Sequence, residues 1–376
     1  MTQKIILFLS LFILVQCNFF STDDESDKKE PVPNSGMWVS GYVASWNYNV
    51  GGHGNWGNTG REELNWNAFT HGIFFAQRIS ESTCLPGEPE AWENISPDRI
   101  IAFTEDAQAN NVQAIMSFGG AGNEAFRECI ETQPETIAQG IADFMNDWGF
   151  DGVDIDPEPV PDAESFENFM ELLRQKIPNA IITGASMTGG NAAVAFAAAE
   201  EYFDQINIMT YDLSGAWGGW YSWHNSPIYN PSGGSEVVNI PGSGTEYPNI
   251  EQLVNKFQEA GVPLEKLGFG IDLYGYVWTG VNTPEQDASG ATRRYGETSY
   301  DNLVEEFPGI ATDPQWDENA KAAWYGTDNQ FISFDNVRTI RAKFDYAREK
   351  GVGGMIVWEI TGSKELSDEV ATQLGN

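Results

Sequence analysis

The sequence has few of the residues from which metal sites are built. It contains three cysteines and three histidines in 376 residues, and none has the CxxC, HExxH or His-x-His spacing of zinc sites. Its glycine-rich stretches include no GxxxxGK[ST] motif and lack the context of a nucleotide-binding turn. We therefore expect no metal and no other cofactor, and we do not expect nucleotide chemistry.

Basic residues are also scarce. Lys and Arg number 20, against 55 Asp and Glu, so the formal net charge is −35. This charge repels DNA and RNA, which excludes a nucleic-acid partner. A neutral polymer is hardly affected by it. The hydrophobic fraction of 41% suits a chain with a large buried core and excludes a disordered polyelectrolyte.

The apolar run at residues 5–15 is too short to span a bilayer and has the length of a secretory signal core. It ends in LVQC at residues 14–17, which resembles the lipobox of bacterial lipoproteins, although Gln16 is larger than the usual residue. We expect residues 1–16 to be a signal peptide and residues 17–35 an acidic, proline-containing tether. The protein is then exported, either as an outer-membrane or cell-surface lipoprotein acylated on Cys17 or, alternatively, as a secreted protein.

Cys84 and Cys129 remain if Cys17 is acylated. In an exported chain two cysteines either pair as a disulfide or stay as two buried thiols, and the sequence leaves both possibilities open. We expect a monomer whose only link to a membrane is the N-terminal lipid.

Short β-branched or aromatic runs alternate with amphipathic helical stretches after residue 36, as in βαβ units. About eight such units in a chain of this length predict an α/β fold, the (β/α)₈ TIM barrel. Helices are expected over residues 135–148 and 336–350. The expected strands are residues 39–44, 71–76, 113–118, 152–156, 180–185, 205–211, 267–273 and 354–358.

Residues 275–331 are too many for a simple connection between the seventh strand and the next helix. They include several aromatic residues, among them Trp278 and Trp316. We expect a small inserted α+β subdomain here, within a catalytic region that covers residues 36–376.

Three acidic residues alternate along the expected fourth strand. In DGVDIDPE, residues 151–158, Asp154, Asp156 and Glu158 point to one face. Neighbours in this row are about 6.6 Å apart along the strand, so they cannot all ionise freely and at least one pKa is raised. A solvated acidic edge or a cation site is the alternative, but calcium sites usually come from loops. The pattern favours a general acid.

This segment resembles the DxxDxDxE signature of glycoside hydrolase family 18, the chitinase family. Further segments are similar to that family's SxGG, MxYD and YGRGW motifs and to its closing strand: SFGG at 117–120, MTYD at 209–212, YGYVWTGV at 274–281 and GGMIVWE at 353–359. The sequence departs from the family at Pro157 and Pro159, which replace Trp and Tyr, and at Tyr276, which replaces Arg. These changes put the shape of the substrate subsites in question.

The resemblance implies a role for each acidic residue. Glu158 would protonate the glycosidic oxygen, while the substrate's own 2-acetamido group acts as nucleophile. Asp156 would stabilise the developing cation, and Asp154 would share a proton with Asp156. Tyr211 would donate its hydroxyl to the acetamido oxygen, with Met209 beneath the sugar.

Other residues receive supporting roles. Asp212 would help to position the substrate, and Asp151 has the opposite parity to the acidic row, which favours a structural hydrogen bond. Ser117 and Gly119 are interpreted as scaffold that lets the backbone approach the acidic strand. Four tryptophans near expected strand ends or in loops are candidates for stacking on sugars: Trp46, Trp217, Trp278 and Trp358.

The resemblance therefore implies a chitinase that hydrolyses β-1,4 links between N-acetylglucosamine units, with chitin or chitooligosaccharides as partners. An endo-β-N-acetylglucosaminidase that acts on N-glycans is an alternative with the same chemistry. A non-catalytic, lectin-like chitin-binding barrel is an alternative of another class, although such proteins commonly lack the acid that Glu158 supplies.

Overall fold

The computed structural model describes residues 36–48, 59–87, 95–294 and 298–376. They belong to one compact unit. The predictions for the signal peptide, the tether and Cys17 lie outside the described residues.

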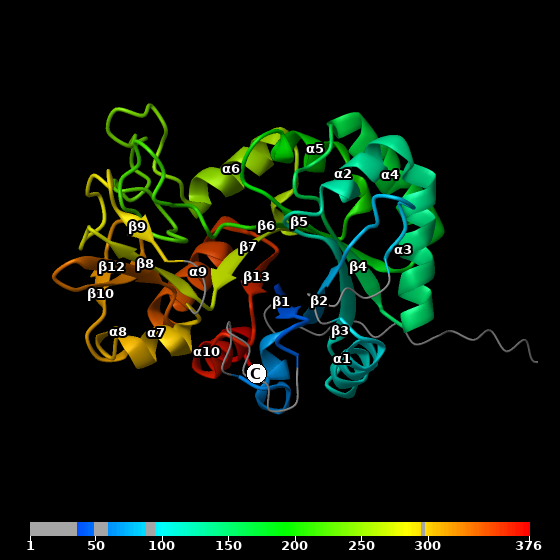
Figure 1. The fold of residues 1–376 in the computed structure, drawn as a ribbon, viewed down its shortest axis with the longest axis horizontal. Coiled ribbons are helices and arrows are strands. Elements are labelled where there is room, and N and C mark those ends of the chain that lie inside the picture. The colour runs from blue at the N-terminus through cyan, green and yellow to red at the C-terminus, as the bar shows by residue number, and fades with distance from the viewer. Residues whose placement is uncertain (1–35, 49–58, 88–94, 295–297) are drawn as a thin grey trace, which may run out of the picture. The chain divides into compact units, whose positions relative to one another are not determined.

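Eight parallel strands close into a barrel in the order β1-β13-β7-β6-β5-β4-β3-β2, and helices surround it (Figure 1). The α/β barrel prediction is confirmed. The barrel strands are β1 (Trp38–Ala44), β2 (His71–Gln77), β3 (Gln113–Gly119), β4 (Gly152–Asp156), β5 (Ile181–Ser186), β6 (Gln205–Ile208), β7 (Leu267–Asp272) and β13 (Gly354–Trp358).

The helices pack an apolar side against the barrel and have sequence signals at their ends. In α9 (Val337–Lys350), the Asn336 side chain caps the first turn by accepting hydrogen bonds from the amides of Arg338 and Thr339, and Gly351 ends the helix with a φ of 79°. The other helices around the barrel are α1 (Pro97–Ala109), α2 (Glu124–Thr132), α3 (Pro134–Trp148), α4 (Ala163–Lys176), α5 (Ala192–Ala198), α6 (Ile250–Ala260) and α10 (Lys364–Leu374).

A second sheet lies between β7 and α9, as the length of this segment predicted. Its five strands have the order β10-β11-β12-β8-β9 and are antiparallel. It extends to Phe334, three residues past the predicted limit. The elements are β8 (Gly275–Thr279), β9 (Thr292–Arg293), α7 (Tyr300–Glu306), α8 (Gly309–Thr312), β10 (Gln315–Asp317), β11 (Ala322–Gly326) and β12 (Gln330–Phe334).

The connection from β6 to α6, residues 209–249, is a long segment that the sequence analysis did not separate from its surroundings. It contains no helix and no barrel strand. Strand β6 also ends at Ile208, three residues before its predicted end, so the MTYD segment lies beyond the strand. Trp223 of this connection packs with Ala320 and Ala322 of the inserted subdomain. The connection therefore joins the barrel mouth to the second sheet.

In the described part of the chain, every helix is too short or too polar to cross a membrane.

Candidate active site

Asp154 lies in a layer of polar side chains inside the barrel. It is in register with Ser117 of β3 and with Thr183 of β5. Ser117 Oγ donates to Asp154 Oδ2 over 2.9 Å, and Thr183 Oγ1 donates to Asp154 Oδ1 over 2.6 Å. In-register side chains on adjacent parallel strands point into the same interior, which explains this contact. Tyr42 of β1 also donates to Asp154 Oδ2, over 3.1 Å.

Burial dominates the electrostatics of Asp154, which is fully enclosed. Loss of water raises its pKa, while the three hydroxyl donors oppose that rise. Because both carboxyl oxygens already accept hydrogen bonds from hydroxyl groups, Asp154 is held in one orientation. The prediction that it shares a proton with Asp156 stays a prediction.

Asp156 is buried at the end of β4, and its Oδ1 has no hydrogen-bond partner among the described residues. Burial, followed by the charges of Glu158 and Asp154, raises its pKa well above the ordinary value. A buried acceptor without a donor is costly unless something else supplies the donor. Asp156 therefore offers an acceptor site to a bound molecule.

Glu158 follows β4 by two residues and is half-buried. Burial raises its pKa, and the charge of Asp212 raises it further, while a hydrogen bond from the backbone of Ala121 opposes both. A carboxyl group with a raised pKa keeps its proton to higher pH, which is the property of a general acid.

Tyr211 is buried beside this group of carboxyls. Burial first, and then the charges of Asp156 and Asp212, raise the pKa of its phenol well above the ordinary value. The hydroxyl therefore stays protonated and can donate. Gly270 of β7 makes room for the ring, because a Cβ at Gly270 would lie 2.5 Å from Tyr211 Cδ1.

Glycine at position 119 lets β3 approach the acidic strand, as the SxGG segment predicted. A Cβ on Gly119 would lie 2.2 Å from the carbonyl oxygen of Asp156, and the residue has a φ of 111°. The next amide, that of Gly120, donates to the same carbonyl over 2.9 Å.

Asp151 has the structural hydrogen bond expected of it, since its Oδ2 accepts from the amide of Ala114 over 2.8 Å.

Aromatic rings gather where β1, β2 and β13 end. The half-buried ring of Trp358 contacts Tyr42 at 5.7 Å and Phe75 at 4.9 Å between ring centres. The half-buried ring of Trp46 meets Phe75 edge-on at 6.1 Å. Trp46 and Trp358 therefore belong to one aromatic cluster, through Phe75.

Trp217 lies in the β6–α6 connection and is 44% exposed. It meets Trp220 edge-on at 4.5 Å between ring centres. Gly215 is required here, because a Cβ would lie 2.4 Å from the Trp217 ring. A cavity of about 950 Å³ is lined by both tryptophans and by Asp212. Trp217 thus offers a ring surface in the cavity that Asp212 also lines, and the charge of Asp212 raises the pKa of Glu158.

Trp278 corrects one prediction. Its side chain is 0% exposed and packs with Tyr276 and Phe331. The physical reason is that β8 lies inside the second sheet, between β12 and β9, rather than in a loop at the barrel mouth. A ring without exposed surface offers no face to a sugar.

Asp212 is exposed and lies just past β6 with a φ of 57°. Its Oδ1 accepts two hydrogen bonds, from the hydroxyls of Tyr274 over 2.6 Å and Tyr276 over 2.7 Å. Its amide donates to Asn225 Oδ1 over 3.0 Å. Residues at the second sheet and in the β6–α6 connection therefore both fix the position of Asp212.

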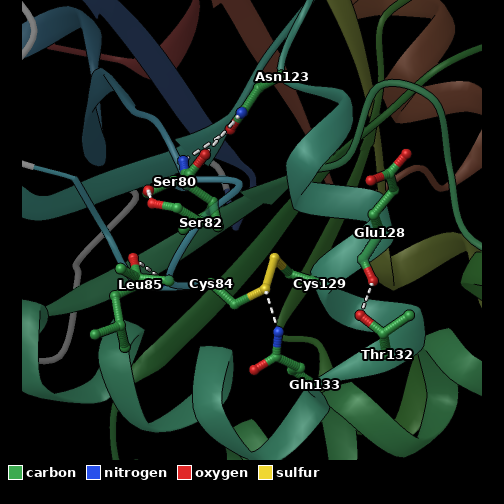
Figure 2. Close-up of a disulfide and its surroundings, with 11 residues drawn as sticks. Ser80, Ser82, Cys84, Leu85, Asn123, Glu128, Cys129, Thr132 and Gln133 are labelled. Carbon is green, nitrogen blue, oxygen red and sulfur yellow. Dashed lines mark hydrogen bonds between the residues drawn. A yellow bond between two sulfur atoms is a disulfide. The ribbon is translucent and has the colours of Figure 1, made fainter.

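The structure joins Cys84 and Cys129 in a disulfide, which decides between the two alternatives left by the sequence. Figure 2 shows the bond between the segment that follows β2 and helix α2. Gln133 Nε2 donates to Cys84 Sγ over 3.2 Å, and Asn123 bonds both the amide and the carbonyl of Ile79. These contacts fasten the segment that leaves β2 to α2.

Comparison with known proteins agrees with this geometry. The sequence profile of the glycosyl hydrolases family 18 matches residues 41–362. The chain belongs to this family. Chitinase C of Streptomyces lividans is 30% identical over 286 residues, which are 70% of this chain and 44% of that protein. Chitinase 1 of Aphanocladium album is 27% identical over 363 residues, 84% of this chain and 82% of that protein. The chain thus spans less than half of the Streptomyces relative.

Solved structures give the same fold. The group IV chitinase of Ostrinia furnacalis superposes with a TM-score of 0.74 at 23% identity, over 90% of this chain and 100% of that chain. This likeness concerns the fold alone.

One departure from the family motif has a visible effect in this family 18 chain. Tyr276 stands where the motif has Arg, and its hydroxyl binds Asp212.

Within the described ranges, no three Cys, His, Asp or Glu side chains come together in a way that could hold a metal ion.

The sequence analysis gave no individual role to five residues that the structure places at the site: Tyr42, Phe75, Thr183, Asn225 and Tyr274. Thr183 could have been found, because the expected strand 180–185 places it beside β4. Asn225 carries no local signal, since its bond to Asp212 depends on how the long connection folds.

Proposed function

We propose that the protein is a chitinase that hydrolyses the β-1,4 linkage between N-acetylglucosamine units. The observation that carries this proposal is the pair of neighbouring carboxyl groups of Asp156 and Glu158 at the end of β4, where burial and neighbouring charge raise both pKa values. Because both pKa values are raised, the pair holds a proton to higher pH, and a carboxyl group that keeps its proton suits acid-assisted cleavage of a glycosidic bond.

The proposed reaction is substrate-assisted and retains the anomeric configuration. Glu158 gives its proton to the leaving oxygen, and the carbonyl oxygen of the substrate's 2-acetamido group bonds to the anomeric carbon as the glycosidic bond breaks. The free Oδ1 of Asp156 accepts from the acetamido N–H, and the protonated phenol of Tyr211 donates to the acetamido oxygen. Water then opens the oxazolinium ring, and Glu158 recovers its proton from that water.

The aromatic surfaces support a sugar polymer as the substrate. Trp358 would lie under the sugar that is cleaved, and Trp217 would contact the chain beside Asp212, where the cavity of about 950 Å³ is large enough for sugar units. Stacked rings and a few polar groups are the usual way to bind a neutral polymer. The names of the relatives favour chitin over an N-glycan, and the Ostrinia furnacalis chitinase has also been solved in complex with allosamidin.

Product analysis tests the substrate class. The enzyme is incubated with colloidal chitin and, in parallel, with a high-mannose glycoprotein, and the soluble sugars are identified. Release of chitooligosaccharides from chitin alone is the expected result. Release of intact N-glycans would instead support the endo-β-N-acetylglucosaminidase alternative, and binding to chitin without release would support the lectin-like alternative.

A second experiment tests the mechanism. Chitin oligomers should be cut with retention, while fully deacetylated oligomers, which lack the acetamido nucleophile, should remain intact. Nuclear magnetic resonance of the first-formed anomer decides this, and an inverted product or comparable cleavage of the deacetylated oligomer would contradict the mechanism.

For the cellular location, we propose an exported protein anchored by a lipid on Cys17. The proposal rests on the apolar run at residues 5–15 and the LVQC sequence that follows. Cys17→Ser should abolish labelling with a fatty-acid analogue and release the protein from the membrane fraction, because acylation is the anchor that the sequence offers. Membrane retention of that variant would contradict the proposal.

A further inference from the structure

Arg293 lies on the edge strand of the second sheet and points toward the candidate site. It faces Trp278 in the antiparallel pair of β9 with β8, so it shares a sheet face with Tyr276, two residues away from Trp278. The guanidinium carbon of Arg293 lies 3.7 Å from the centre of the Tyr276 ring. At this distance the ring face attracts the cation.

The same guanidinium reaches the β6–α6 connection. Arg293 Nη1 donates to the carbonyl oxygen of Ser214, and the guanidinium carbon lies 5.9 Å from the centre of the Trp217 ring. Arg293 therefore contacts two points of the segment 212–217, while Tyr276 binds a third through the Asp212 carboxylate. One stacked pair joins the second sheet to this segment.

We propose that Arg293 and Tyr276 are positioning residues that hold segment 212–217 against the second sheet, so that Asp212 stays beside Glu158 and Trp217 keeps its place at the cavity. This proposal rests on the proposed function. Tyr276 occupies the motif position of an Arg, and in this chain the guanidinium of Arg293, from the neighbouring strand, stacks on the Tyr276 ring.

The chain provides a matched control in the next residue. Arg294 pairs with Glu306 over 2.7 Å, and both side chains are more than a third exposed. Arg294→Met removes the same charge from the same strand end without touching segment 212–217. We expect its activity and pH dependence to equal those of the wild type.

Kinetics on chitin oligomers test the role in catalysis. Arg293→Met and Tyr276→Phe should each lower kcat/KM about tenfold, because a small displacement of a catalytic or binding group is costly. The alkaline limb of the pH profile should also move to lower pH, since Asp212 opposes the ionisation of Glu158 less when it is displaced. Arg293→Lys keeps the charge but not the planar stack, so it should recover only part of the loss.

A double-variant cycle tests whether the two residues act together. Because both residues hold the same segment, the double variant should lose less than the sum of the two single losses, with each loss expressed as a free energy. Additive losses, or an Arg293→Met enzyme with wild-type kcat/KM and a wild-type pH profile, would overturn the proposal.

Hydrogen exchange tests the contact without any substrate. The amides of residues 213–217 should exchange faster in Arg293→Met than in the wild type or in Arg294→Met. Unchanged exchange would overturn the proposal. If the wild type does not cleave chitin oligomers, the proposed function fails, whereas exchange still decides the positioning role. Should Arg293→Met fail to fold, Tyr276→Phe serves in the same experiment.

Discussion

Thr183 donates its hydroxyl hydrogen to Asp154, with 2.6 Å between the two oxygens. The pair links adjacent strands β4 and β5 inside the barrel, where neither residue has exposed surface. A side-chain hydrogen bond from β5 thus helps to fix the acidic strand β4.

Thr183→Val should lower the free energy of unfolding by about 1–3 kcal/mol, because it leaves Asp154 Oδ1 without its donor in a buried place. Urea unfolding followed by circular dichroism measures the difference. Thr132→Val is the control, since Thr132 makes its hydrogen bond on an exposed helix surface. Equal stability of the two variants would mean that the Thr183 bond does not support Asp154.

Glu158→Gln should keep the fold and the affinity for chitin oligomers while kcat falls by about 10²–10⁴, the usual contribution of a general acid. Steady-state kinetics give kcat, and calorimetry gives the affinity. Glu167→Gln, an exposed change on α4, should retain full activity. Wild-type turnover in Glu158→Gln would exclude Glu158 as the acid.

Asp212→Asn should move the alkaline limb of the kcat/KM profile to lower pH. The negative charge of Asp212 raises the pKa of Glu158, so its removal lets Glu158 lose its proton at lower pH, and the acid form disappears earlier. Asp143→Asn on the exposed side of α3 provides the control. A limb that stays in place would show that Asp212 does not influence the acid.

Glu359→Gln should change how stability depends on pH. Burial raises the pKa of Glu359 from 4.5 to about 7, although hydrogen bonds from Thr361 and Asn47 oppose this. The folded state holds this proton more tightly than the unfolded state, so its stabilising effect is complete below pH 4.5 and is lost as pH rises through 7. The wild type should therefore lose about 3 kcal/mol relative to the variant across this range. If the free energy of unfolding, measured with urea, changes with pH in the same way for the two proteins, the raised pKa of Glu359 is contradicted.

Replacing Cys84 and Cys129 by Ala should lower the free energy of unfolding by about 4 kcal/mol, the chain-entropy value for a loop of 45 residues. Urea unfolding without reductant measures the loss. Wild-type protein unfolded in the presence of reductant should match the variant. If reductant leaves the wild type as stable as before, the disulfide does not stabilise the fold.

The sequence was sufficient for the barrel because its strands and helices repeat with clear periods and caps. Asp154, Asp156 and Glu158 could be placed on one face because side chains alternate along a strand. The raised pKa values followed from the same crowding, and the structure adds burial as the larger cause.

The parts that could not be predicted depend on contacts between distant segments. Trp278 was assigned to the mouth because a tryptophan near a strand end has the same local sequence whether it faces solvent or a second layer. The hydrogen bonds of Asp212 with Tyr276 and Asn225 join the second sheet to two separate positions of the β6–α6 connection. No local period encodes such contacts.

The acidic residues and Trp217 come from different parts of the chain, and this has an evolutionary consequence. Asp154 is anchored by β3 and β5, whereas Trp217 belongs to a long connection that is attached to the second sheet. Descendants of such a barrel can change the rings that this connection presents to a polymer, while the strand that carries the acids is inherited unchanged.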